Sequence, residues 1–181
     1  MKKQVQFTAQ RPDGSIPTNQ LWMRVTRIPN LEYAVLMAHV FVYEDLCWLL
    51  GVRLHTDSLP ERLPPFLTLV DIALAGSEFE ADRDTLRFLN SARNEIAHDT
   101  DRPKFDGCVR NFCSRLWSDQ TYGTPGFQWK QVERKQVEAL WYAVGVLSAR
   151  FGDFFDRFTE QEAVKTRSLN PRKRKAAAGD K

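Results

Sequence analysis

The chain has few cysteines and no long uninterrupted apolar run. Its three cysteines are an odd number, and Cys108 and Cys113 are five positions apart, which is not a zinc-knuckle spacing. This usage argues against a disulfide framework and favours a reducing cytoplasm. The longest apolar run, residues 41–50, is interrupted by Glu44 and Asp45. We therefore expect no membrane-spanning segment.

Signals for export and for cofactor binding are also missing. Residues 1–4 are followed by no apolar segment, so they do not form a secretory signal. No cluster of His, Cys and acidic residues has the spacing of metal ligands, and no glycine-rich loop could cradle a phosphate. We expect neither a metal nor another cofactor.

The net charge of +3 is unevenly distributed. The 181 residues fit one domain. Residues 165–181 carry a net charge of +6, so residues 1–164 carry −3. A mildly acidic body is a poor general surface for nucleic acid. Any contact with RNA would need a local cleft or the basic tail.

Apolar residues repeat at helical spacing in five segments, each bounded by residues that start or stop helices. The expected helices cover residues 30–51, 65–76, 80–98, a segment that follows Asp106, and a long segment that begins near Lys130. Loops are expected over residues 99–105 and 118–128. This pattern predicts an all-α fold, an antiparallel bundle of four to five helices.

The two ends of the chain have different patterns. Residues 1–29 alternate apolar and polar side chains on both sides of a turn that contains Pro12 and Gly14. They predict a short β-hairpin or an arm. Residues 30–164 form the helical domain. Residues 165–181 lack apolar periodicity and are expected to be a disordered basic tail.

One segment at the end of the third expected helix combines chemistry-bearing residues. It reads Arg93-Asn94-Glu95-Ile96-Ala97-His98 and contains one of only three histidines. It resembles the Arg-x4-6-His signature of the HEPN superfamily. That resemblance implies a small all-helical domain, and many such domains are metal-independent ribonucleases whose active site forms across a dimer. Other members use the fold only for binding.

The chemistry of the two residues agrees with that expectation. A guanidinium at Arg93 can bind a phosphate, and an imidazole at His98 can transfer protons. Together they suit attack by an RNA 2′-OH without a metal. Five residues correspond to about 140° of rotation, so the two side chains leave the helix on different faces. A composite site therefore needs a second copy of the helix, in a homodimer.

Three further residues are candidates for supporting roles. Asn94 lies four positions before His98 and could hold its imidazole in one orientation. HEPN proteins often carry an acidic residue in the first helix that faces the motif, and Glu44 or Asp45 is the candidate here. The alternative is that one of these acids marks the solvated side. Equally, Arg93 could make only ion pairs while His98 caps a helix C-terminus.

The sequence also suggests roles for the other two histidines and argues against one route of regulation. His39, four positions before Tyr43, is expected to be a partly buried structural histidine, and His55 to be exposed. HEPN toxins paired with a nucleotidyltransferase antitoxin often carry a tyrosine two positions after the motif histidine. Thr100 stands there in this chain, which argues against regulation by that route.

A second resemblance extends from about Ala34 to Leu116. An early acidic helix, the Arg-Asn-x-x-Ala-His segment, Phe105-Asp106 and then Cys113 are similar to the mannitol-operon repressor-like proteins. That family is regarded as regulatory, without established catalysis. The alternative function is therefore a non-catalytic regulator or interaction module that holds a partner on the same dimer face.

The basic run Arg172, Lys173, Arg174 and Lys175 has two interpretations. It can attract the phosphate backbone of RNA, or it can be a solvated end that aids solubility. The first hypothesis for the whole chain is a cytoplasmic endoribonuclease in a toxin–antitoxin or phage-defence setting. Its expected partners are RNA, a second copy of the chain, and an antitoxin or regulatory protein.

Overall fold

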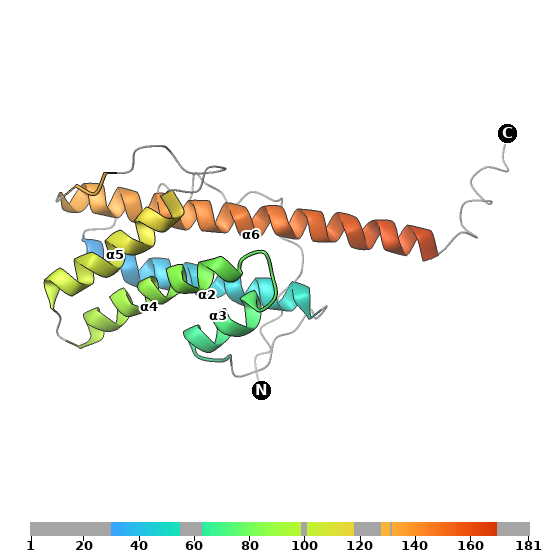
Figure 1. Ribbon diagram of the computed structural model, residues 1–181, viewed down its shortest axis with the longest axis horizontal. Coiled ribbons are helices and arrows are strands. Elements are labelled where there is room, and N and C mark those ends of the chain that lie inside the picture. The colour runs from blue at the N-terminus through green and yellow to red at the C-terminus, as the bar shows by residue number, and fades with distance from the viewer. Residues whose placement is uncertain (1–29, 55–62, 99–100, 118–127, 131, 170–181) are drawn as a thin grey trace, which may run out of the picture.

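The structure, a computed structural model, confirms the predicted all-α fold class. It describes residues 30–54, 63–98, 101–117, 128–130 and 132–169. These residues form five α-helices, α2 to α6, and a short 3-10 turn, with no strand among them (Figure 1). The expected hairpin or arm over residues 1–29 and the basic run over residues 172–175 lie outside the described residues.

Helix α2, Leu31–Arg53, is the central element. The side-chain oxygen of Asn30 accepts a hydrogen bond from the backbone N–H of Tyr33 at 2.8 Å, which caps the helix where the sequence predicted its start. The helix continues two residues past Gly51, the predicted stop. Helices α3, α4 and α6 all pack against α2, and this explains why it is apolar on most sides.

The apolar composition of α2 is relevant to whether the chain has a membrane-spanning helix. By length and apolar composition alone, α2 is a helix that could cross a membrane. A core helix surrounded by its neighbours passes the same test, and α2 has neighbours of that kind. The absence of a membrane span therefore stays a prediction.

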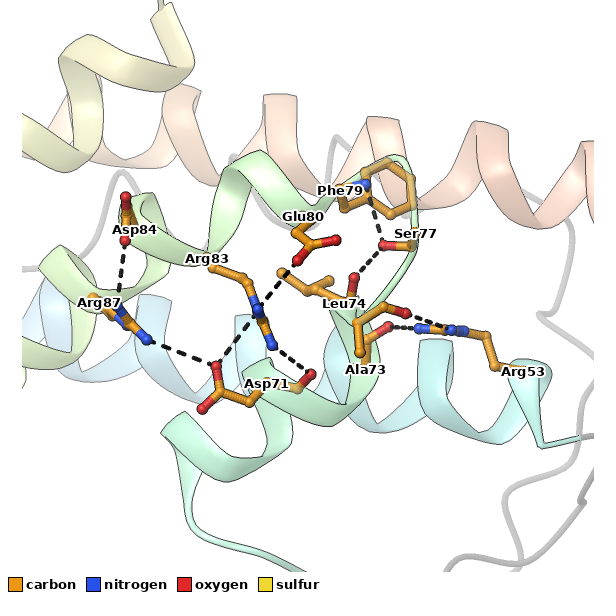
Figure 2. Close-up of polar contacts among 11 residues, drawn as sticks. Arg53, Asp71, Ala73, Leu74, Ser77, Phe79, Glu80, Arg83, Asp84 and Arg87 are labelled. Carbon is orange, nitrogen blue, oxygen red and sulfur yellow. Dashed lines mark hydrogen bonds and ion pairs between the residues drawn. The ribbon is translucent and has the colours of Figure 1, made fainter.

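Helix α3, Phe66–Leu74, lies against α2 and ends in a tight turn. Pro65 precedes it and Gly76 follows with a φ of +61°, as the sequence predicted for this start and stop. The guanidinium of Arg53, at the end of α2, donates hydrogen bonds to the carbonyl oxygens of Ala73 and Ala75 (Figure 2). These bonds satisfy carbonyls that the helix end leaves unpaired.

The 3-10 turn η1, Glu80–Asp82, leads into α4, Arg83–Ala97. The third helix, predicted over residues 80–98, therefore exists, but its first three residues form the 3-10 turn and His98 is its C-terminal cap residue. Arg83 and Arg87 of α4 both pair with Asp71 of α3 (Figure 2). Helix α4 is thereby fixed to α3 on one side while its apolar stripe packs into the core.

Helix α5, Arg102–Trp117, begins earlier than the sequence predicted. The expected loop over residues 99–105 was too long, because Pro103 lies inside the first helical turn. Proline is tolerated there since the N–H that it lacks has no partner within the helix. Phe105 is consequently part of the buried face of α5.

Helix α6, Glu133–Leu169, is longer than predicted at its C-terminal end. It continues five residues past position 164, where we expected the helical domain to end, and Figure 1 shows it projecting beyond the other helices. In that view α6 runs in the same direction as α2, and α4 runs against both. The side chain of Glu133 accepts a hydrogen bond from the backbone N–H of Leu31, joining the N-terminal ends of α6 and α2 at 3.1 Å.

The turn at Gly76 gives a prediction about stability. Gly76→Ala should lower the free energy of unfolding by about 1 to 2 kcal/mol, because a left-handed backbone brings Cβ too close to a carbonyl oxygen. Gly145→Ala, in α6, is the matched control. It should raise the same free energy by about 0.5 to 1 kcal/mol, because its Cβ meets no atom within 4 Å. Urea denaturation measures both, and an unchanged or raised stability for Gly76→Ala would contradict the role of this turn.

Candidate functional site

Arg93 and His98 are both exposed, near the C-terminal end of α4. The backbone N–H of His98 donates to the carbonyl oxygen of Glu95 at 3.3 Å, which closes the last turn of the helix. Arg93 lies on a different face of α4, at about 140° from His98 by helical geometry. Both side chains are accessible to solvent, but they do not converge on a common site within one copy of α4.

Asn94 pairs with Arg93. The guanidinium of Arg93 donates a hydrogen bond from Nη1 to Oδ1 of Asn94, at 3.2 Å. The side-chain oxygen of Asn94 is thus engaged by the guanidinium, and the orientation of His98 by Asn94 stays a prediction.

Asp45 faces α6. Its carboxylate accepts a hydrogen bond from the hydroxyl of Ser148, a buried residue of α6. Glu44, the other acid expected to support Arg93, is exposed on α2. Of these two acids, Asp45 is therefore placed to join the central helix to α6.

His39 of α2 is a histidine whose pKa is lowered, chiefly by burial and to a smaller degree by the positive charge of Arg93 on α4. His39 and Asp45 are six residues apart, or about 240° around the helix, so they face different neighbours. The sequence singled out His39 only as a structural histidine, because the influence of Arg93 on its pKa depends on how α2 and α4 pack.

His39 is held between neighbouring side chains. Its ring stacks on Phe66 of α3 with centroids 4.1 Å apart, and the ring of Tyr43 stacks on the same phenylalanine at 6.4 Å. Nε2 of His39 is buried and has no hydrogen-bond partner among the described residues. Burial lowers the pKa of His39, the polar side chain of Asn90 acts in the opposite direction, and the charge of Arg93 lowers the pKa further.

Arg93 differs from most other arginines of the bundle. Arg83, Arg102 and Arg150 each pair with at least one carboxylate within 4.0 Å. Arg93 has no such partner in the described part of the chain. Glu95, the acid inside the motif, pairs with Lys104 of α5 instead. Among the described residues, no carboxylate therefore neutralises the charge of Arg93.

The cysteines do not add a nucleophile to this region. Burial raises the pKa of Cys47 to about 11, and it also raises the pKa of Cys108 and Cys113. All three thiols are therefore protonated near neutral pH. Within the described ranges, no group of three or more His, Cys, Asp or Glu side chains could hold a metal ion.

Comparisons with known proteins give no relative. No family model matches the chain, and neither a curated protein nor a solved structure matches it.

The environment of His39 predicts how stability depends on pH. Its pKa is lower in the folded protein than in the unfolded chain. The unfolded chain therefore binds a proton at His39 more readily than the folded protein does. The contribution of neutral His39 to the free energy of unfolding is complete above about pH 6.5, and it is lost as the pH falls through the folded-state pKa. His39→Phe should flatten the decline in unfolding free energy between about pH 7 and pH 5.

Arg93→Gln separates the two causes of the lowered pKa. It removes the neighbouring charge but leaves the burial, so it should weaken the pH dependence without abolishing it. Denaturant titrations at several pH values measure the slope. A slope that His39→Phe leaves unchanged would show that another group is responsible.

Proposed function

We propose that the chain is one subunit of a metal-independent endoribonuclease of the HEPN type that acts as a homodimer. The observation that carries the proposal is the state of Arg93. Its guanidinium is exposed, held by Asn94, and has no carboxylate partner among the described residues. Such a group is suited to bind an RNA phosphate with two parallel hydrogen bonds.

The proposed reaction is attack of an RNA 2′-OH on the adjacent phosphorus. The 2′ oxygen loses its proton, a 2′,3′-cyclic phosphate forms, and the 5′ oxygen of the next nucleotide leaves with a proton. Arg93 would stabilise the charge that develops on the phosphate oxygens. His98 would transfer protons, as an exposed imidazole at the end of α4 can do.

The separation of Arg93 and His98 supports a dimeric site. The two side chains leave one helix on different faces, so each phosphate would meet residues from two copies of α4. A two-fold axis would bring two Arg93 and two His98 side chains into one cleft. We further propose a cytoplasmic toxin–antitoxin or phage-defence setting, in which a second protein restrains the nuclease.

A second candidate function rests on a different observation. Tyr33, Leu36 and Val40 lie on one face of α2 and remain exposed. An exposed apolar stripe of this kind is typical of a surface that binds another protein. It favours the alternative, a HEPN-like regulator or interaction module without catalytic activity.

RNA cleavage in the presence of EDTA tests the proposed function. Wild-type protein should cleave RNA and spare DNA, which lacks the 2′-OH. Arg93→Ala and His98→Ala should each lower the rate by at least about 100-fold, because each removes a group that acts in the transition state. Arg110→Ala is the matched control, since Arg110 is also exposed and has no carboxylate partner among the described residues.

Two outcomes would decide against the nuclease. If Arg93→Ala and His98→Ala both cleave as fast as the wild type, the activity does not come from this motif. If a stable wild-type dimer cleaves no tRNA, mRNA or ribosomal RNA, the regulatory function is favoured. Truncation of the stripe by Leu36→Ala should then weaken binding of the protein partner.

A further inference from the structure

The exposed side of α2 has no charged residue over about three turns. Residues 33–43 contain no Asp, Glu, Lys or Arg, and the exposed residues among them are Tyr33, Leu36 and Val40. We call these three residues the α2 stripe. They are 38% to 48% exposed, although the solvated side of a helix is ordinarily charged or polar. The α2 stripe therefore has the composition of a contact surface.

Two exposed glutamates border the α2 stripe. By helical geometry, Glu32 lies about 40° to one side of Leu36 and Glu44 about 80° to the other. Glu32 pairs with Arg102 of α5 at 2.8 Å, so its edge of the stripe faces α5. The stripe is therefore an apolar band with an acidic residue on each edge.

The spacing of the α2 stripe suits contact with an identical stripe. Tyr33 and Val40 lie at nearly equal distances along the helix on either side of Leu36. In an antiparallel contact, Tyr33 of each copy would meet Val40 of the other, and the two Leu36 side chains would meet at the two-fold axis. Such an interface is isologous, because the same patch serves on both copies. An apolar centre is typical of homodimer interfaces.

The glutamates favour the antiparallel direction. In a parallel contact, each glutamate would lie beside its own equivalent, where like charges repel. In an antiparallel contact centred between residues 36 and 37, the two Glu32 residues are about 13 Å apart along the helices and the two Glu44 residues about 22 Å. These separations exceed the distance of about 8 Å over which physiological salt screens exposed charges.

We infer that the α2 stripe is the contact between two copies of this chain, with their α2 helices antiparallel about a two-fold axis beside Leu36. The second copy is the occupant that the symmetric spacing of the stripe and the positions of its glutamates favour. The inference names the interface of the proposed homodimeric nuclease, and the catalytic role of the second copy rests on that proposed function.

This contact would bring the two motifs to one side of the dimer. Arg102 follows the last residue of α4 by five positions, and its pair with Glu32 places the C-terminal end of α4 at the Glu32 edge. Helix α4 runs against α2 and ends beside its N-terminal half (Figure 1). A two-fold axis at right angles to both α2 helices keeps the two Glu32 edges on the same side. Arg93 of one copy and His98 of the other could then serve one phosphate.

Sedimentation of the full chain tests the contact. Wild-type protein should be a dimer, and Leu36→Glu should weaken the dimer by at least about 100-fold, because it buries two carboxylates at the axis without a cation. The matched control is Ile72→Glu on α3, since Ile72 is 48% exposed, as Val40 is, but lies outside the stripe. The control should leave the dimer unchanged. Circular dichroism shows for each variant whether it is folded.

Cross-linking tests the direction of the two helices. In a Cys108→Ser background, a mixture of Tyr33→Cys and Val40→Cys should form an interchain disulfide on mild oxidation, because the antiparallel contact sets these positions opposite each other. Neither variant alone should do so. The remaining native thiols, Cys47 and Cys113, are buried. Disulfides of each variant with itself would indicate a parallel contact and overturn the antiparallel arrangement.

Mixing two inactive variants tests the composite site. In a heterodimer of Arg93→Ala and His98→Ala, one of the two sites keeps an intact arginine from one copy and an intact histidine from the other. Half of the dimers in an equal mixture are heterodimers, so RNA cleavage should return to about one quarter of the wild-type rate. Leu36→Glu added to both variants should abolish this recovery, and Ile72→Glu should not.

The outcomes separate this inference from the proposed function. A dimer that Leu36→Glu leaves intact would overturn the α2 stripe as the contact, while RNA cleavage that depends on Arg93 would still support the nuclease. A dimer that depends on the stripe but cleaves no RNA would support the contact and overturn the nuclease. A monomeric wild type would overturn the inference and leave the stripe to a different protein.

Discussion

The burial of α2 by three other helices is the constraint on which the rest of this protein depends. Helices α3, α4 and α6 pack around it, and its apolar side chains form much of the core. Polar residues within such a helix need partners, because an unpaired buried polar group costs free energy. Asp45 accepts a hydrogen bond from Ser148, and the ring of His39 stacks on Phe66.

Several carboxylates around α4 pair with cations other than Arg93. Asp71 pairs with two arginines of α4, Asp82 pairs with Arg150 of α6, and Glu95 pairs with Lys104 of α5. These contacts join neighbouring elements at the edges of the core. Each of these carboxylates is thereby directed to another cation, and Arg93 is held by a neutral amide instead.

The position of the motif on α4 connects the fold with the proposed chemistry. The C-terminal end of this helix exposes Arg93 on one face and His98 on another. A nuclease would need two subunits, and a regulator could use the same faces to hold a partner.

The sequence by itself determined the helical class and the core. Apolar spacing predicted the stripes of α2, α4 and α6, and the cap residues Asn30 and Gly76 lie where predicted, because these signals are local. The start of α5 was predicted too late, because Pro103 was assigned to a loop although proline is tolerated in a first helical turn. The tertiary structure alone decided the partners of Asp45 and His39. It directed Asp45 to Ser148 of α6 and stacked His39 on Phe66 of α3, because such contacts depend on how separate helices pack against each other.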